Sequence, residues 1–255
     1  MIRVTHKYLR QTIPAESGEQ HCILLLISAR GRVPRTNPME QNATLARSLR
    51  TSRAAAIVGV LFALLLTTAL VLVRLAASAD PGDLAAVLAE PGKRRMFVVA
   101  LHLVPFAGIA FLWSIGVVRD RIGQREDRFF ATVFLGSGLL FVGMLFVASA
   151  ATAAFLADVA VRAGMPQPIS SFDRRIGAIV LHVYAMRMAA VFMVATARIG
   201  LRTGFIPRWL CFSGYAFALV LLLVAGATPW VELLFPLWVL LLSIDILAVN
   251  SRLGP

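Results

Sequence analysis

The sequence predicts an all-α fold, a polytopic bundle of six transmembrane helices within residues 54–249, and two observations predict it. Six long apolar stretches follow Ala54, and a helix needs about 20 apolar residues to cross a bilayer. The composition agrees, because 59% of the residues are hydrophobic and only 15% are charged, whereas soluble domains are about 45–50% apolar and about 25% charged. The polar segments between the stretches are too short for a globular domain, so we expect one membrane domain.

Residues 1–53 are polar and basic, and we interpret them as a partly disordered cytoplasmic N-terminal tail. Their apolar run from Cys22 to Ile27 is too short to cross a bilayer and lacks the small-residue cleavage site of a signal peptide. In a second interpretation, translation starts at Met39, which begins a short segment before the first span, and residues 1–38 are not translated. At the other end, residues 250–255 form a short cytoplasmic tail.

The six predicted spans are, in chain order, Ala54–Ala76, Met96–Val118, Phe129–Val161, Ile176–Ala197, Trp209–Gly226 and Trp230–Val249. The third is longer than a bilayer requires, so we expect it to project beyond one membrane surface. It is also rich in small residues, with glycines at 136, 138 and 143 and an Ala/Ser/Thr run from Ala148 to Ala154. Small residues allow helices to approach closely in a membrane, which predicts a central place for this span.

Two loops carry patterns of their own. In the first outer loop, Asp83 can cap a short helix that Pro91 and Gly92 end. Three apolar residues recur in it at helical spacing, so we expect a helix lying on the membrane surface (Leu84, Val87, Leu88). The inner loop, residues 119–128, alternates positive and negative side chains and is interpreted as a solvated cytoplasmic turn.

The net charge of +12 does not indicate a nucleic-acid-binding protein. Such a protein would cluster its basic residues on one soluble face, whereas here they lie between the apolar stretches, where Lys and Arg set membrane orientation. Eleven of them flank one set of span ends and seven flank the other. This bias places both termini in the cytoplasm. We therefore expect a multi-pass protein of the cell membrane, and the preference for Arg over Lys favours a bacterial inner membrane.

A weak internal repeat links the second and fourth spans. The segment from Arg94 to His102 matches the segment from Arg174 to His182 at an offset of 80 residues, each with an Arg-Arg pair before an apolar run that leads to a histidine. A duplicated helical hairpin would explain the match. Chance matching of apolar residues is the alternative.

Four ionisable residues lie inside the predicted spans and away from their ends, where such residues are costly and mark functional sites: His102, His182, Arg187 and Asp245. The two histidines are expected at the same depth, facing the bundle interior. Three roles remain open for them: hydrogen bonds between helices, handling of protons or substrate, and ligation of one haem b iron or another metal ion. One histidine pair without further ligands predicts no definite metal site.

Arg187 lies near the predicted midplane and needs a carboxylate or water there. Asp245 of the sixth span is a comparably deep carboxylate about 7 Å away along the axis, so we expect the two to pair and their helices to be neighbours. Glu232 is a rival partner, but it is expected near the outer surface, where it reaches water. The alternative to an ion pair is a substrate-anion site at Arg187.

Other kinds of site find no support in the sequence. It holds no glycine-rich phosphate loop, no nucleophile elbow and no His-Glu-x-x-His motif, so we predict no catalytic residues. The two cysteines, Cys22 and Cys211, are far apart in a tail and a span, and neither a disulfide nor a metal site is inferred from them.

The segment Thr-Gly-Phe-Ile-Pro-Arg-Trp-Leu, residues 203–210, joins the fourth and fifth spans. It resembles the Gly-Phe-x-Pro-Arg turn of a family of uncharacterised bacterial multi-span membrane proteins, a six-helix domain of unknown function. The outer segment Pro81-Gly-Asp with the Ala/Leu-rich helix after it is also similar. The resemblance covers residues 54–249 and implies six helices, but no catalytic residues, because that family has no settled activity.

Three functions follow as hypotheses. The first is a non-enzymatic membrane protein that helps other components assemble or scaffolds them, without a cofactor. The second is a small transporter or carrier with a polar site at Arg187, and the third is an electron-transfer subunit with haem at His102 and His182. The expected partners are the lipid bilayer and either another membrane protein or a second copy of the chain, not nucleic acid.

Overall fold

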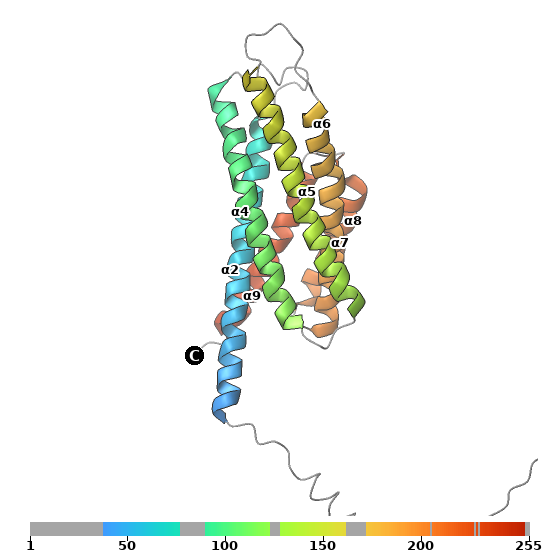
Figure 1. The fold of residues 1–255 in the computed structure, drawn as a ribbon. Helices are drawn as coiled ribbons and strands as arrows, with labels where there is room; N and C mark the ends of the chain where they lie inside the picture. Colours follow the sequence, from blue (N-terminus) through green and yellow to red (C-terminus); the bar gives the residue numbers. More distant parts are fainter. Residues whose placement is uncertain are drawn as a thin grey trace, which may run out of the picture. The chain divides into compact units, whose positions relative to one another are not determined.

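The computed structural model describes residues 38–76, 90–122, 128–161, 172–204, 206–226, 228 and 230–252, and these consist of helices and the turns between them, with no strand. The chain divides into two compact units, Met1–Ala46 and Arg47–Pro255. The second unit holds all the apolar helices, which run alongside one another as a bundle (Figure 1). The all-α prediction is confirmed.

The helices of the bundle follow in chain order. They are α2 (Pro38–Ala76), α4 (Pro91–Ile122), α5 (Arg128–Val161), α6 (Phe172–Ile179), the π-helix η2 (Val180–Ala185), α7 (Met186–Thr203), α8 (Arg208–Val224), the 3-10 helix η3 (Val231–Leu233) and α9 (Leu234–Arg252). The segments α6, η2 and α7 are consecutive, so they form one helical rod interrupted by a π-turn.

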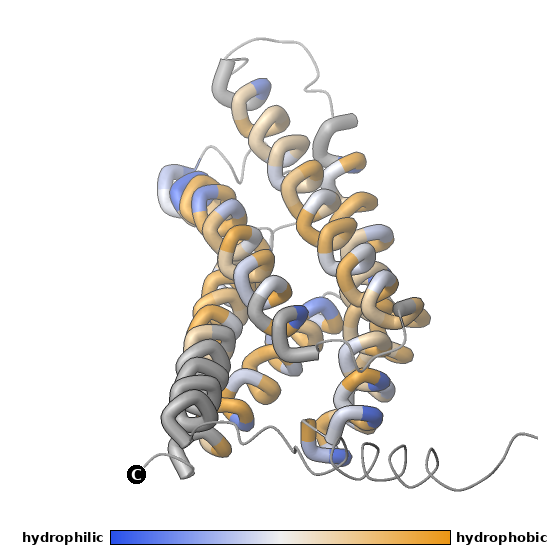
Figure 2. The backbone as a smooth tube through the Cα atoms, turned by 60° about the horizontal axis from the view of Figure 1, so that its bottom comes forward, coloured by the Kyte–Doolittle hydropathy of each residue, from blue (hydrophilic) through white to orange (hydrophobic). Residues whose placement is uncertain are grey.

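Five segments are long and apolar enough to cross a membrane: Ala56–Ala76, Pro91–Gly116, Phe129–Asp158, Arg175–Thr203 and Val231–Val249. They match five of the six predicted spans. The predicted fifth span corresponds to α8, an apolar helix of 17 residues. Figure 2 shows hydrophobic colour along the bundle helices and hydrophilic colour mainly near their ends.

Two helices begin before the spans predicted within them. The predicted first span, Ala54–Ala76, agrees with the membrane-crossing segment Ala56–Ala76. Its helix α2 begins earlier, at Pro38, because extending an existing helix costs far less than starting one and the polar residues before Ala54 include good helix formers. α4 begins at Pro91 rather than Met96. Pro91 and Gly92 therefore open this helix, and proline suits a first turn because an N–H there would have no partner within the helix. The predicted surface helix itself and residues 1–37 lie outside the described residues.

The core of the bundle is a cluster of phenylalanines, to which each long span contributes. Six buried rings form it: Phe62 of α2, Phe111 of α4, Phe134 and Phe141 of α5, Phe192 of α7 and Phe235 of α9. Ring centroids lie 4.6 Å apart for Phe62–Phe111 and 4.9 Å apart for Phe141–Phe235. Tilted and edge-on ring pairs at these separations attract one another beyond simple packing, so the cluster joins the helices at one level.

The third span is long and central, as the sequence predicted. α5 has 34 residues, about 51 Å of helix, and it packs against α4, α6, η2 and α7. Its glycines differ in how closely neighbouring side chains approach them. A side chain at Gly138 would meet Ile115 and Phe192, whereas nothing lies within 4 Å of the Cβ position at Gly136 or Gly143.

The proposed duplication is not confirmed by the shapes of its two halves. α4 is α-helical throughout the stretch that holds His102, whereas the equivalent stretch of the fourth span is the π-helix η2, which holds His182. The two histidines therefore lie in different backbone surroundings.

A tight turn joins α7 and α8. Gly204 has a left-handed backbone (φ 68°), which costs glycine little, and its N–H donates to the Gly200 carbonyl at 3.0 Å. The chain then folds back so that Ile206 covers Gly200, where an added Cβ would lie 2.6 Å from the Ile206 side chain. Gly200 is thus required for this turn to close.

Gly200→Ala should lower the melting temperature of the protein in detergent, because displacing Ile206 costs about 1–3 kcal/mol. Gly143→Ala is the matched control, since its Cβ position is open and alanine favours a helix by up to about 1 kcal/mol over glycine. Heating each purified variant and following the folded fraction by size-exclusion chromatography measures both. Equal melting temperatures for the two variants would contradict the packing described for the turn.

Candidate functional site

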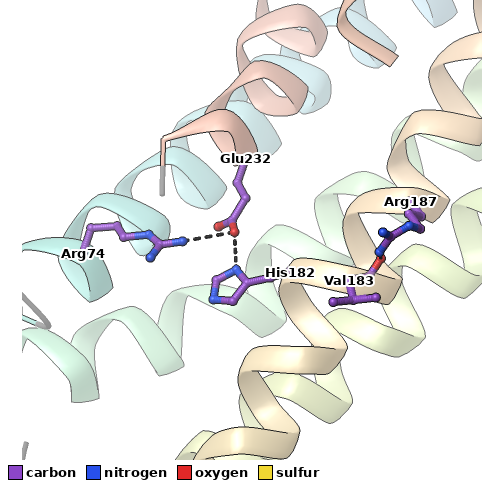
Figure 3. Close-up of polar contacts among 5 residues, drawn as sticks. All are labelled: Arg74, His182, Val183, Arg187 and Glu232. Atoms are coloured by element: carbon purple, nitrogen blue, oxygen red, sulfur yellow. Dashed lines mark hydrogen bonds and ion pairs between the residues drawn. The ribbon is translucent and has the colours of Figure 1, made fainter. Parts of the chain in front are cut away.

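Three side chains from distant parts of the chain meet at one end of the bundle. Arg74 lies in the last turn of α2, His182 lies in the π-helix η2, and Glu232 lies in η3 just before α9. Figure 3 shows the arginine and the histidine converging on the carboxylate. We call these three residues the polar triad.

Both partners bond the same oxygen of Glu232. The Nη2 atom of Arg74 donates to Glu232 Oε1 at 3.0 Å, and His182 Nδ1 bonds to this same oxygen. An ionised carboxylate only accepts, so a bond between it and His182 requires the hydrogen on Nδ1. In the neutral ring, Nε2 of His182 is then a bare acceptor.

Burial makes these bonds necessary. The Glu232 side chain is only 2% exposed, against 25% for Arg74 and 26% for His182. An unpaired buried carboxylate would be strongly destabilising, and its bonds to a cation and to an N–H donor offset that cost. The second oxygen, Oε2, is buried and has no hydrogen-bond partner among the described residues, so the triad retains an open acceptor.

The local backbone explains how His182 reaches Glu232. In η2 the hydrogen bonds span five residues, as in the bond from the Met186 N–H to the Leu181 carbonyl, and such turns often occur at functional sites. The turn after α8 approaches from the other side. Its Gly226 has a positive φ of 90°, and a Cβ there would lie 3.9 Å from His182 Cβ.

Arg187 does not join the triad. Its Nη1 donates to the carbonyl of Val183 at 2.8 Å, within its own helical rod, and Figure 3 shows it apart from Glu232. The expected ion pair with Asp245 does not form among the described residues. The helices α7 and α9 do touch, with 6.2 Å between the Phe192 and Phe235 ring centroids. A substrate role for Arg187 and Asp245 remains a prediction.

The two histidines differ in their surroundings. His182 contacts another helix, as expected, but the expectation that His102 faces the bundle interior is wrong. His102 is exposed on α4, and its Nδ1 bonds the carbonyl of Val98, four residues earlier, at 2.7 Å. This position gives no support to a haem shared by the pair, which stays a prediction. The described residues hold no cluster of three or more potential metal ligands.

Sequence reasoning noted all three members of the triad but did not bring them together. His182 was a site candidate, Arg74 was one of the seven basic residues counted at the outer span ends, and Glu232 was expected to reach water, which its burial shows to be wrong. One signal pointed to the arrangement. Arg74 and Glu232 are opposite charges at two span ends predicted on the same membrane side, which makes an ion pair between those ends possible.

Comparison of the chain with protein-family models, with curated proteins and with solved structures finds no match. The resemblance of residues 203–210 to a turn of uncharacterised membrane proteins therefore stays a prediction. What the site can do is argued from its own chemistry. It can hold three helices together, and it offers two acceptors without a donor among the described residues, Glu232 Oε2 and, in the tautomer with the hydrogen on Nδ1, His182 Nε2.

Replacing one member of the Arg74–Glu232 pair should destabilise the protein more than replacing both. Arg74→Met leaves a buried carboxylate with only His182, at a cost of about 3–5 kcal/mol. The double variant Arg74→Met, Glu232→Leu should lose less than the sum of its two single changes. Melting temperatures in detergent measure all three, with the exposed Arg94→Met as a control that should change little. Additive losses would show that Arg74 and Glu232 do not interact.

Proposed function

We propose that the chain is a multi-pass protein of the cell membrane in which α8 makes a sixth crossing and both termini lie in the cytoplasm. The 17 residues of α8 reach the lower end of the range of about 17–25 that can cross a bilayer. Exposed tryptophans flank this segment, Trp209 in its first turn and Trp230 beyond its last, 58% and 54% exposed. Aromatic residues gather at both membrane surfaces, so this spacing supports a crossing.

We further propose a non-enzymatic role as an assembly or scaffold component. The observation that supports it is that the buried Glu232 bonds both Arg74 and His182. The polar triad thereby connects the end of the first span to the fourth span and to the last. A bundle fixed in this way presents a constant outer surface. On α4 that surface carries exposed aromatic residues, among them Phe106 and Trp113, which can pack against lipid or against a partner helix.

A small carrier is the second candidate, and it is favoured by polar atoms that lack a hydrogen-bond partner among the described residues. Glu232 Oε2 lacks a donor among the described residues. Arg187 has five N–H donors, and among the described residues one of them is bonded, to Val183. Unsatisfied polar groups inside a membrane bundle are expensive and are typical of substrate or ion pathways.

Two measurements separate these roles. Purification from the native membrane in mild detergent should yield the chain in a complex of fixed stoichiometry if it is a scaffold. Liposomes that hold the purified chain should then show no more flux of small anions or protons than protein-free liposomes. Flux that Arg187→Leu abolishes, with the melting temperature unchanged, would contradict the scaffold role and support the carrier.

Reporter fusions test the sixth crossing. A reporter that is active only outside the cytoplasm should be inactive when fused after Gln124 or after Gly204 and active after Thr228, because α8 separates the last two positions. The controls are the same reporter on a secreted and on a cytoplasmic protein. Equal activity after Gly204 and Thr228 would mean that α8 does not cross, and the two termini would then lie on opposite sides.

A further inference from the structure

Two arginines of α7 share one aromatic ring at the end of the bundle where α5 begins. The guanidinium carbon of Arg198 lies 5.7 Å from the centroid of the Phe130 ring, and that of Arg202 lies 5.9 Å from the same centroid. Phe130 is in the first turn of α5, which packs against α7. Since the two arginines are four residues apart on one helix, they are neighbours on its surface. Two positive charges are therefore held close to each other.

This pair of charges is more than packing requires. Like charges at this spacing destabilise a helix, and Phe130 has no net negative charge to offset them. Arg202 lies in the last turn of α7, where the helix dipole favours a cation. Arg198 lies a turn further into the helix and is only partly exposed, so the dipole does not account for it. An anion within reach of both guanidinium groups would offset their repulsion.

Arg198 has hydrogen-bond donors to offer such an anion. Its guanidinium group carries five N–H donors and a permanent positive charge. Among the described residues this group contacts the Phe130 ring, and no hydrogen bond or ion pair engages it. The planar fork of a guanidinium group matches two oxygens of a phosphate. The arrangement therefore suits an anion of the phosphate class.

We propose that Arg198 and Arg202 bind the headgroup phosphate of an anionic phospholipid, with the Phe130 ring as the platform that holds both guanidinium groups. The position along the membrane supports this source of phosphate. Trp209, in the first turn of α8, is exposed, and such tryptophans mark the level of the lipid headgroups. Arg198 precedes Thr203, the last residue of α7, by five residues, or about 7.5 Å of helix. A long arginine side chain can extend to the headgroup level over that distance.

The apolar neighbours favour a lipid over free phosphate. Phe129 is exposed, and its ring centroid lies 5.4 Å from that of Phe130. Phe212 of α8 is also exposed. An acyl chain can pack along such side chains, whereas inorganic phosphate gains nothing from them.

Net charge selects among lipids. The ammonium group of a zwitterionic headgroup would be repelled by two arginines, and an anionic headgroup such as phosphatidylglycerol has no such group. Basic pockets between membrane helices on the cytoplasmic side bind anionic headgroups. The proposed topology places this end of the bundle at the cytoplasmic surface, where anionic lipids create a negative surface potential.

The test is native mass spectrometry of the full chain released from detergent. The chain is titrated with phosphatidylglycerol, with phosphatidylcholine of the same acyl chains, and with inorganic phosphate. Phosphatidylglycerol should bind about tenfold more tightly than phosphatidylcholine, or better, and inorganic phosphate should not displace it. The double variant Arg198→Gln, Arg202→Gln should lose this preference.

The matched control is the double variant Arg94→Gln, Arg95→Gln. It removes the same amount of charge from two exposed arginines in the first turns of α4, and it should keep the preference for phosphatidylglycerol. The melting temperature of each variant in the same detergent shows whether it is folded.

Three results would overturn the proposal. The wild-type protein could bind both lipids equally, inorganic phosphate could displace phosphatidylglycerol, or the two double variants could behave alike. The first two are read from the wild-type protein, so they decide the question even if a variant fails to fold. The proposal goes beyond the scaffold role. Because the lipid affinities do not depend on partners or on flux, their failure is distinguishable from failure of that role.

Discussion

The buried carboxylate of Glu232 is the constraint on which the rest of the bundle depends. A charge with 2% of its side chain exposed is tolerated only where its partners are held in place. Arg74 must then sit at the end of α2, His182 must turn toward the start of α9, and the turn after α8 must leave room for both. One carboxylate thus fixes the relative positions of segments that lie 158 and 50 residues away in the sequence.

The phenylalanine cluster supports the same arrangement further along the bundle. Phe235 follows Glu232 by one turn of helix and packs against Phe62, Phe141 and Phe192. In a bilayer there is little hydrophobic gain when helices associate, because lipid tails are as apolar as the side chains. Close ring packing and a few polar bonds must therefore carry the association. The triad supplies bonds between specific partners, and the rings supply the packing.

The sequence predicts the spans well because the length of an apolar stretch is a local property. It does not predict how far α2 and α4 extend before their spans, because a helix can continue from the membrane into polar residues such as those before Ala54, and because Pro91 can begin a helix as well as end one. The length and central place of α5 were predicted from its composition. The fifth predicted span, α8, is the short one, since two tight turns at Gly204 and Gly226 limit it.

The site was less predictable than the fold. Depth along a helix can be counted from the sequence, and this count identified His182 and Arg187. The direction in which a side chain points cannot be derived from residue spacing once a π-turn changes the helical register, as it does at residues 180–185. For this reason His102 and His182 match in sequence and differ in surroundings, and Arg187 bonds its own backbone. The burial of Glu232 depends on contacts with segments far away in the chain.

The central claim is that Glu232 is an ionised carboxylate shared by Arg74 and His182, and infrared spectroscopy tests it most directly. The difference spectrum between the wild-type protein and Glu232→Gln, recorded in lipid at neutral pH, isolates the vibrations of this one side chain. We expect a carboxylate band whose position changes when Arg74 is replaced by Met. A protonated carboxylic acid band, or a carboxylate band that ignores the Arg74 substitution, would contradict the account.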